Sequence, residues 1–138
     1  MSEEETGIRV FVDAKIIGMH DKQSPKSAYV GYYVQDLGFH REIPIEASES
    51  DDAEIQAILF AIDDLKERFV RITVVCDHES VVSEAKRDSV KKPTPLLEKL
   101  RKILRDNPRI SLEALGSNLA HRYLTLYVNE LKQNSSQV

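Results

Sequence analysis

The sequence has little of what stabilises small secreted or membrane-bound domains. Cys76 is its only cysteine, so no internal disulfide can form, and we expect a reducing, cytoplasmic location. No Cys-x-x-Cys pair or His/Cys cluster indicates a structural zinc site. No apolar run approaches the roughly 20 residues that span a bilayer. The acidic start MSEEETG lacks the basic and apolar regions of a signal peptide, so we expect no contact with a membrane.

An excess of positive charge is also missing, because the formal charge of the 138-residue chain is −4. The charges are unevenly distributed, however. Nine basic and three acidic residues lie between Lys86 and Arg109, so that segment carries +6 and the remainder −10. A basic segment on an acidic body can bind a polyanion, but a solvated helix face has the same composition. Charge alone leaves both interpretations open.

The length fits one domain, and the hydrophobic pattern divides it into strands and helices. Runs rich in β-branched or apolar residues predict five strands, at 8–19, 28–36, 39–47, 70–77 and 109–115. The first three are joined by short turns and form an antiparallel meander. Pro44 indicates that the end of the third strand lies at a sheet edge, and Gly31 indicates a bulge or a close approach.

Helices occupy most of the remaining chain. Apolar residues at helical spacing predict helices over about 51–68, 79–87 and 117–132. Another helix starts at Pro95, with Thr94 as its N-cap, and ends at RDNP. The order βββαβααβα predicts an α/β domain with a mixed five-stranded sheet, three antiparallel strands and then two parallel ones, and helices on both faces. We assign 8–132 to this domain, 1–7 to a disordered acidic N-terminus and 133–138 to a flexible tail.

Three acidic residues stand at unusual places in these elements. Asp13 lies inside the first strand, Asp77 ends the apolar fourth strand, and Glu54 begins the first long helix. If the first and fourth strands are parallel neighbours, the three carboxylates can meet at one sheet edge, where a cation such as Mg²⁺ would hold them together. Each also has an ordinary alternative: Asp13 on a solvent face, Asp77 as a helix cap, Glu54 as a helix-dipole partner.

The motifs around these acids resemble those of the ribonuclease H family, in its compact type 1 branch. VFVDAK resembles the family's first-strand motif, DDAEIQAILFAIDDL its helix motif, VVCDHESVV its strand-end motif, and GSNLAHRYLTL its C-terminal helix motif. The resemblance covers about 8–132. It implies the ribonuclease H-like fold and an endonuclease that cleaves the RNA strand of RNA–DNA hybrids with two Mg²⁺ (or Mn²⁺) ions.

The resemblance also implies a role for each site residue. Asp13 would bridge the two metal ions, and Glu54 and Asp77 would complete their coordination. His121 stands where the family has a fourth acid, and its imidazole would suit Mn²⁺ better than Mg²⁺. The alternative is that His121 is a half-buried helix residue beside a site of three carboxylates.

Other residues of these motifs, and two lysines outside them, would contact the substrate. They are Ala14, Lys15, Asp51, Asp52, His78, Lys91, Lys92, Ser117 and Asn118. Asp51 and Asp52 replace two asparagines that contact the hybrid's minor groove; aspartates can accept hydrogen bonds from 2′-hydroxyls but repel phosphates. Residues 86–95 and the basic helix after them take the place of the family's basic protrusion as a surface for the nucleic-acid backbone.

Two other functions fit the same sequence. One is a catalytically weakened or inactive module of this fold that binds nucleic acid or protein. The other is a nuclease of this fold that acts on structured RNA or a DNA junction. The sequence does not decide between a monomer and a homodimer.

Overall fold

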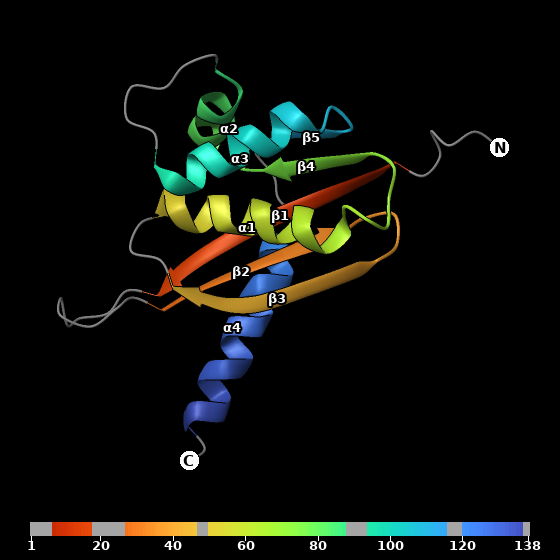
Figure 1. Ribbon diagram of the computed structural model, residues 1–138. Helices are drawn as coiled ribbons and strands as arrows, with labels where there is room; N and C mark the ends of the chain where they lie inside the picture. Colours follow the sequence, from red (N-terminus) through yellow and green to blue (C-terminus); the bar gives the residue numbers. More distant parts are fainter. Residues whose placement is uncertain (1–6, 18–26, 47–49, 88–93, 116–119, 137–138) are drawn as a thin grey trace.

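In the part of the chain that the structure describes, five strands form one sheet and four helices pack on it (Figure 1). This computed structural model describes residues 7–17, 27–46, 50–87, 94–115 and 120–136. The strands are β1 (Ile8–Ile17), β2 (Ser27–Val34), β3 (Phe39–Glu46), β4 (Ile72–Cys76) and β5 (Ile110–Ala114). The helices are α1 (Ser50–Leu65), α2 (Glu79–Lys86), α3 (Pro95–Asp106) and α4 (Ala120–Ser136). The predicted element order is therefore confirmed.

The strand order in the sheet is β3-β2-β1-β4-β5. β1 pairs antiparallel with β2 and parallel with β4, while β3 and β5 extend the sheet in the antiparallel and parallel sense respectively. Both the mixed sheet and the parallel pairing of the first and fourth strands are thus confirmed. β3 is an edge strand, which accommodates Pro44 because a proline has no amide hydrogen to donate to a neighbouring strand.

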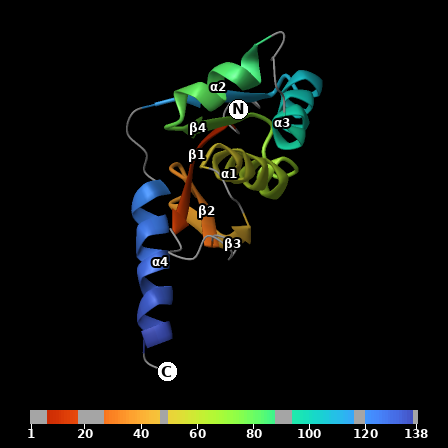
Figure 2. The same ribbon diagram turned by 90° about the vertical axis from the view of Figure 1, so that its left-hand side faces the viewer.

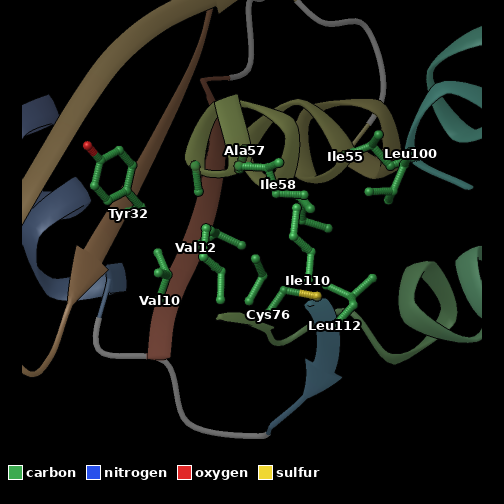
Figure 3. Packing of buried hydrophobic residues seen from close by; sticks show 14 of the residues in the cluster. Val10, Val12, Tyr32, Ile55, Ala57, Ile58, Cys76, Leu100, Ile110 and Leu112 are labelled. Atoms are coloured by element: carbon green, nitrogen blue, oxygen red, sulfur yellow. The ribbon is translucent and has the colours of Figure 1, made fainter. Parts of the chain in front are cut away.

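Helices cover both faces of the sheet, as predicted (Figure 2). Alternate side chains of β1 serve the two faces. Val10 and Val12 pack in the core under α1, together with Tyr32, Ile58 and residues of α3 and β5 (Figure 3). Phe11 and Asp13 face the other way, toward the start of α4. A residue of the central strand can therefore reach the N-terminal end of the last helix.

The ends of the helices differ from the prediction by a few residues. α1 ends at Leu65 rather than 68, because the chain tightens there and the Arg68 amide donates to the carbonyl of Leu65, three residues back. α4 continues to Ser136, so its last four residues overlap the tail predicted for 133–138. Thr94 is confirmed as the N-cap of α3, where its hydroxyl accepts a 3.1 Å hydrogen bond from the Leu97 amide.

The predicted N-terminus, 1–7, lies outside the described residues except for its last one. None of the described helices is long and apolar enough to cross a membrane.

Gly31 lies at a close approach rather than at a bulge. It pairs in regular register with Asp13 on one side and Glu42 on the other. A Cβ atom at this position would lie 3.0 Å from Cγ of Glu42 and 3.2 Å from the carbonyl oxygen of Arg41.

We therefore expect Gly31→Ala to lower the free energy of unfolding by about 1–3 kcal/mol, because the added methyl group overpacks this site. Urea unfolding of the variant and the wild type measures the change. Equal midpoints would show that β3 moves aside without cost.

Candidate metal centre

Two acids, Asp13 in the middle of β1 and Asp77 directly after the end of β4, lie at the same level of the sheet. The parallel register pairs Phe11 with Val75. Asp13 lies two residues farther along β1, and Asp77 lies two residues after Val75, just past the end of β4, so the two side chains are near each other. The electrostatic effect of Asp77 on Asp13 is consistent with this placement.

Asp13 is buried, with 4% of its surface exposed. Burial disfavours its charged form and raises its pKa above the ordinary value; the hydrogen bond with His121 lowers the pKa in part, and the charge of Asp77 raises it further. Oδ2 of Asp13 lies 2.8 Å from Nδ1 of His121. The alternative of a solvent-facing Asp13 is therefore wrong.

Glu54 is the most deeply buried acid of the described chain, with 1% of its surface exposed. It lies in the first turns of α1, a helix that packs on β1, β2 and β4, and no hydrogen-bond partner of its Oε1 exists among the described residues. Burial, and then the charges of Asp13, Asp77 and Asp51, raise its pKa to about 9. A helix-dipole role does not require burial, so the alternative of a simple dipole partner leaves this environment unexplained.

Glu54, Asp77 and His78 form a group in which each offers one ligand atom and all of these atoms lie within 4.8 Å of one another. Asp77 is not the N-cap of α2, since that position is His78 and no side chain caps it. Nε2 of His78 lies 3.8 Å from Oε2 of Glu54, and Nδ1 lies 3.6 Å from Oδ1 of Asp51.

The donor set fits a divalent cation. An unpartnered buried carboxylate oxygen carries a desolvation cost that a bound cation removes, and clustered carboxylates are the oxygen ligands that hard cations prefer. His78, predicted as a substrate contact, also lies within this cluster. The sequence signal for this placement is its position directly after Asp77 at the end of a buried strand.

His121 lies in the first turn of α4, and 66% of its side-chain surface is exposed. The described group around Glu54 does not include His121 or Asp13, which form a pair with each other. The four predicted metal-site residues thus occur as two adjoining pairs, Asp13 with His121 and Glu54 with Asp77.

The structure places part of the predicted substrate contacts. Asp51 and Asp52 lie in the first turn of α1, near the Glu54 cluster, and Ala14 and Lys15 follow Asp13 in β1. The remaining four, Lys91, Lys92, Ser117 and Asn118, lie outside the described residues.

No protein family model matches the chain, and no curated protein matches its sequence. Several solved structures do. The N-terminal ribonuclease H domain of rv2228c from Mycobacterium tuberculosis matches with a TM-score of 0.62 and 19% identity, over 94% of this chain and 98% of that one. LC11 ribonuclease H1 in complex with an RNA/DNA hybrid matches with a TM-score of 0.60 and 19% identity, over 78% of this chain and 84% of that one.

A third match is to a larger protein, the protease–reverse transcriptase of prototype foamy virus. Its TM-score is 0.63 at 18% identity, and the match covers 79% of this chain but only 17% of the viral one. Together with the strand order and the helices on both faces, these matches show that the chain has the ribonuclease H-like fold.

Proposed function

We propose that the protein is a metal-dependent endonuclease that hydrolyses the RNA strand of RNA–DNA hybrids. The observation that carries this proposal is the environment of Glu54: a buried carboxyl group with an unpartnered oxygen, surrounded by the charges of Asp13, Asp77 and Asp51. Without a cation this cluster is electrostatically unfavourable, and a pure scaffold has no need of it. Solved neighbours in complex with an RNA/DNA hybrid support the choice of substrate.

Asp13, Glu54 and Asp77 would hold two divalent cations, Mg²⁺ or Mn²⁺, and His78 and His121 would add nitrogen donors close by. When bound, such ions activate a water molecule and stabilise the leaving oxygen of the phosphodiester. The fold holds the acidic side chains of this site rigidly. Asp13 comes from the central strand, and Glu54 from a helix packed on the core, so their carboxyl groups are positioned before substrate binds.

The N-terminal turn of α1 would recognise the RNA strand. Asp51 is exposed and Asp52 is half-buried there, and their carboxylates can accept hydrogen bonds from 2′-hydroxyl groups. We further propose a cytoplasmic location, on the ground that the single cysteine, Cys76, is buried in the core and forms no internal disulfide.

The test is a cleavage assay with four labelled substrates: an RNA–DNA hybrid, duplex RNA, duplex DNA and single-stranded RNA. Each is incubated with the wild type in Mg²⁺, in Mn²⁺ and in EDTA. We expect cleavage of the RNA strand of the hybrid only, and only with metal. Cleavage of duplex RNA or DNA in preference to the hybrid would reject the substrate, and no cleavage of any substrate would reject the enzyme.

The pair of His121 and Asp13 favours a second candidate, a nucleic-acid-binding module that has lost catalysis. An imidazole replaces the fourth acid there and contacts Asp13 directly at 2.8 Å. Metal-independent binding of the hybrid with no cleavage in either metal would support this candidate.

Removing His121 tests its part in the site. We expect His121→Ala to lower the rate of hybrid cleavage by about 10- to 100-fold, because Asp13 loses the group that orients its carboxylate. The decrease should be larger in Mg²⁺ than in Mn²⁺, which tolerates less regular coordination. Asn129→Ala, at an exposed position of the same helix, is the control. Equal rates for the two variants would show that His121 has no role in catalysis.

A further inference from the structure

His78 brings a nitrogen donor to the candidate metal centre, which is a different role from the substrate contact expected for it. It is the N-cap residue of α2 and follows Asp77 directly. One ligand atom from each of Glu54, Asp77 and His78 lies within 4.8 Å of the other two. Atoms that ligate one ion at about 2.1 Å lie roughly 3–4 Å apart, and Nε2 of His78 lies 3.8 Å from Oε2 of Glu54. The imidazole is therefore close enough to share an ion with the two carboxylates.

The fold holds His78 at this place. Its carbonyl oxygen accepts a 3.2 Å hydrogen bond from the amide of Val82 in α2, and Sγ of Cys76 lies 3.8 Å from the same oxygen. Only 32% of the side-chain surface of His78 is exposed. Because its surroundings already restrict it, the imidazole loses little conformational freedom when it binds an ion.

Asp51 favours one protonation form of the ring. Its Oδ1 lies 3.6 Å from Nδ1 of His78. A carboxylate beside Nδ1 stabilises the tautomer that carries its proton on this nitrogen, and the lone pair of Nε2 is then free for a metal ion. Nε2 is the nitrogen that approaches Glu54, so the tautomer that Asp51 favours is the one that can bind there.

His121, at the fourth metal-site position of the ribonuclease H motifs, is placed differently. Its Nδ1 lies 2.8 Å from Oδ2 of Asp13, and 66% of its side-chain surface is exposed. It is not a member of the group that Glu54, Asp77 and His78 form. Among the described histidines, His78 is therefore the one that shares this group with the buried carboxylate.

The buried oxygen of Glu54 is a second, independent observation that points to an ion at this place. Glu54 is 1% exposed, and its Oε1 has no hydrogen-bond partner among the described residues. A cation shared with Asp77 and His78 would offset the cost of burying this oxygen.

We propose that Nε2 of His78 is a direct ligand of the ion that Glu54 and Asp77 hold, and that it makes the centre selective for a first-row transition-metal ion such as Mn²⁺ over Mg²⁺. The inference rests on the proposed function only for the assignment of Glu54 and Asp77 as ligands. Mg²⁺ binds oxygen and keeps much of its water, so an imidazole adds little to its affinity. Mn²⁺ and the later metals of the series accept imidazole nitrogen more readily, so His78 increases their affinity.

The test is metal binding in the absence of nucleic acid. The full chain is freed of metal with EDTA, dialysed and titrated with Mn²⁺ or Mg²⁺ in a calorimeter, as the wild type, His78→Ala and His121→Ala. His40→Ala is the matched control, because His40 pairs with Glu42 and stacks on Tyr123 outside the centre. At one equivalent of Mn²⁺, pulsed electron paramagnetic resonance detects a nitrogen bound to the ion as a ¹⁴N modulation.

We expect Mn²⁺ to bind the wild type at least about tenfold more tightly than Mg²⁺. His78→Ala should weaken Mn²⁺ binding about 10- to 100-fold and Mg²⁺ binding less than about threefold. The ¹⁴N modulation should be present in the wild type, His40→Ala and His121→Ala, and absent in His78→Ala. If circular dichroism shows that His78→Ala does not fold, His78→Gln, which is similar in size and offers an oxygen, should lack the modulation in the same way.

A modulation that persists without His78 would overturn the proposal. An equal ratio of Mn²⁺ to Mg²⁺ affinity in His78→Ala and the wild type would also overturn it, and loss of the modulation in His121→Ala alone would assign the nitrogen to that residue instead. The proposed function is tested apart from this result. A wild type that cleaves nothing, but whose modulation disappears in His78→Ala, contradicts only the nuclease. Metal-dependent cleavage by a wild type that shows no ¹⁴N modulation contradicts only the role of His78.

Discussion

Asp13→Asn is expected to lower the rate of hybrid cleavage at least about a thousandfold in Mg²⁺. Asparagine keeps the shape of the side chain and can still bond His121, but it removes the negative charge that would hold the cations. Metal ions stabilise the charge that develops in phosphoryl transfer and so lower the reaction barrier by several kcal/mol. Each 1.36 kcal/mol corresponds to a factor of ten in rate. The measurement is the initial rate of RNA-strand cleavage under single-turnover conditions, which separates chemistry from product release.

The matched control for this variant is Asp36→Asn, the same chemical change at an exposed turn position. Near-ultraviolet circular dichroism of both variants should equal that of the wild type, which would show that the fold is intact. A second readout does not depend on activity: Mg²⁺ should raise the Tm of the wild type and of Asp36→Asn, but should raise that of Asp13→Asn less. If Asp13→Asn keeps a tenth or more of the wild-type rate, Asp13 is not a ligand of the metal centre.

Glu54→Gln is expected to stabilise the metal-free protein at neutral and alkaline pH. The pKa of Glu54 is about 9 in the folded chain, whereas the ordinary pKa of a glutamate is 4.5. Between these values the folded state binds more protons than the unfolded state, so the free energy of unfolding falls as the pH rises. Glutamine keeps the shape without an ionisable group. At pH 8 the gain in stability is on the order of a few kcal/mol.

Urea unfolding in EDTA at several values between pH 5 and pH 9 measures this effect. The wild type should lose stability across the window, and Glu54→Gln should lose less; a residual slope remains because the pKa of Asp13 is raised too. Adding Mg²⁺ should stabilise the wild type more than the variant, since glutamine removes one of the three carboxylate ligands. Glu67→Gln, at an exposed position after α1, should leave the profile unchanged. The same slope in Glu54→Gln as in the wild type would show that Glu54 does not titrate in this window.

The sequence determined the element order, and with it the neighbourhood of the acids. The apolar run of β4 and the meander before it left few topologies, and right-handed parallel connections place β1 beside β4. Once these strands are neighbours, Asp13 and Asp77 lie close together, beyond the last paired residues of β1 and β4. Glu54 joins them because α1 packs on these strands and its first turns lie near the two acids. These are consequences of periodicity and connection rules, which local sequence encodes.

Only the tertiary structure decided which side chains touch. His78 lies beside Glu54, and His121 contacts Asp13 across 108 positions of the chain. The same holds for the basic segment, whose charge pattern fitted both a solvated face and a polyanion site. The packing of α2 on α3 brings Arg87, Arg101 and Arg105 around one hollow, while Lys99 lies on another side of α3. Helix packing angles and rotamers set such contacts, and they depend on the whole core rather than on any local pattern.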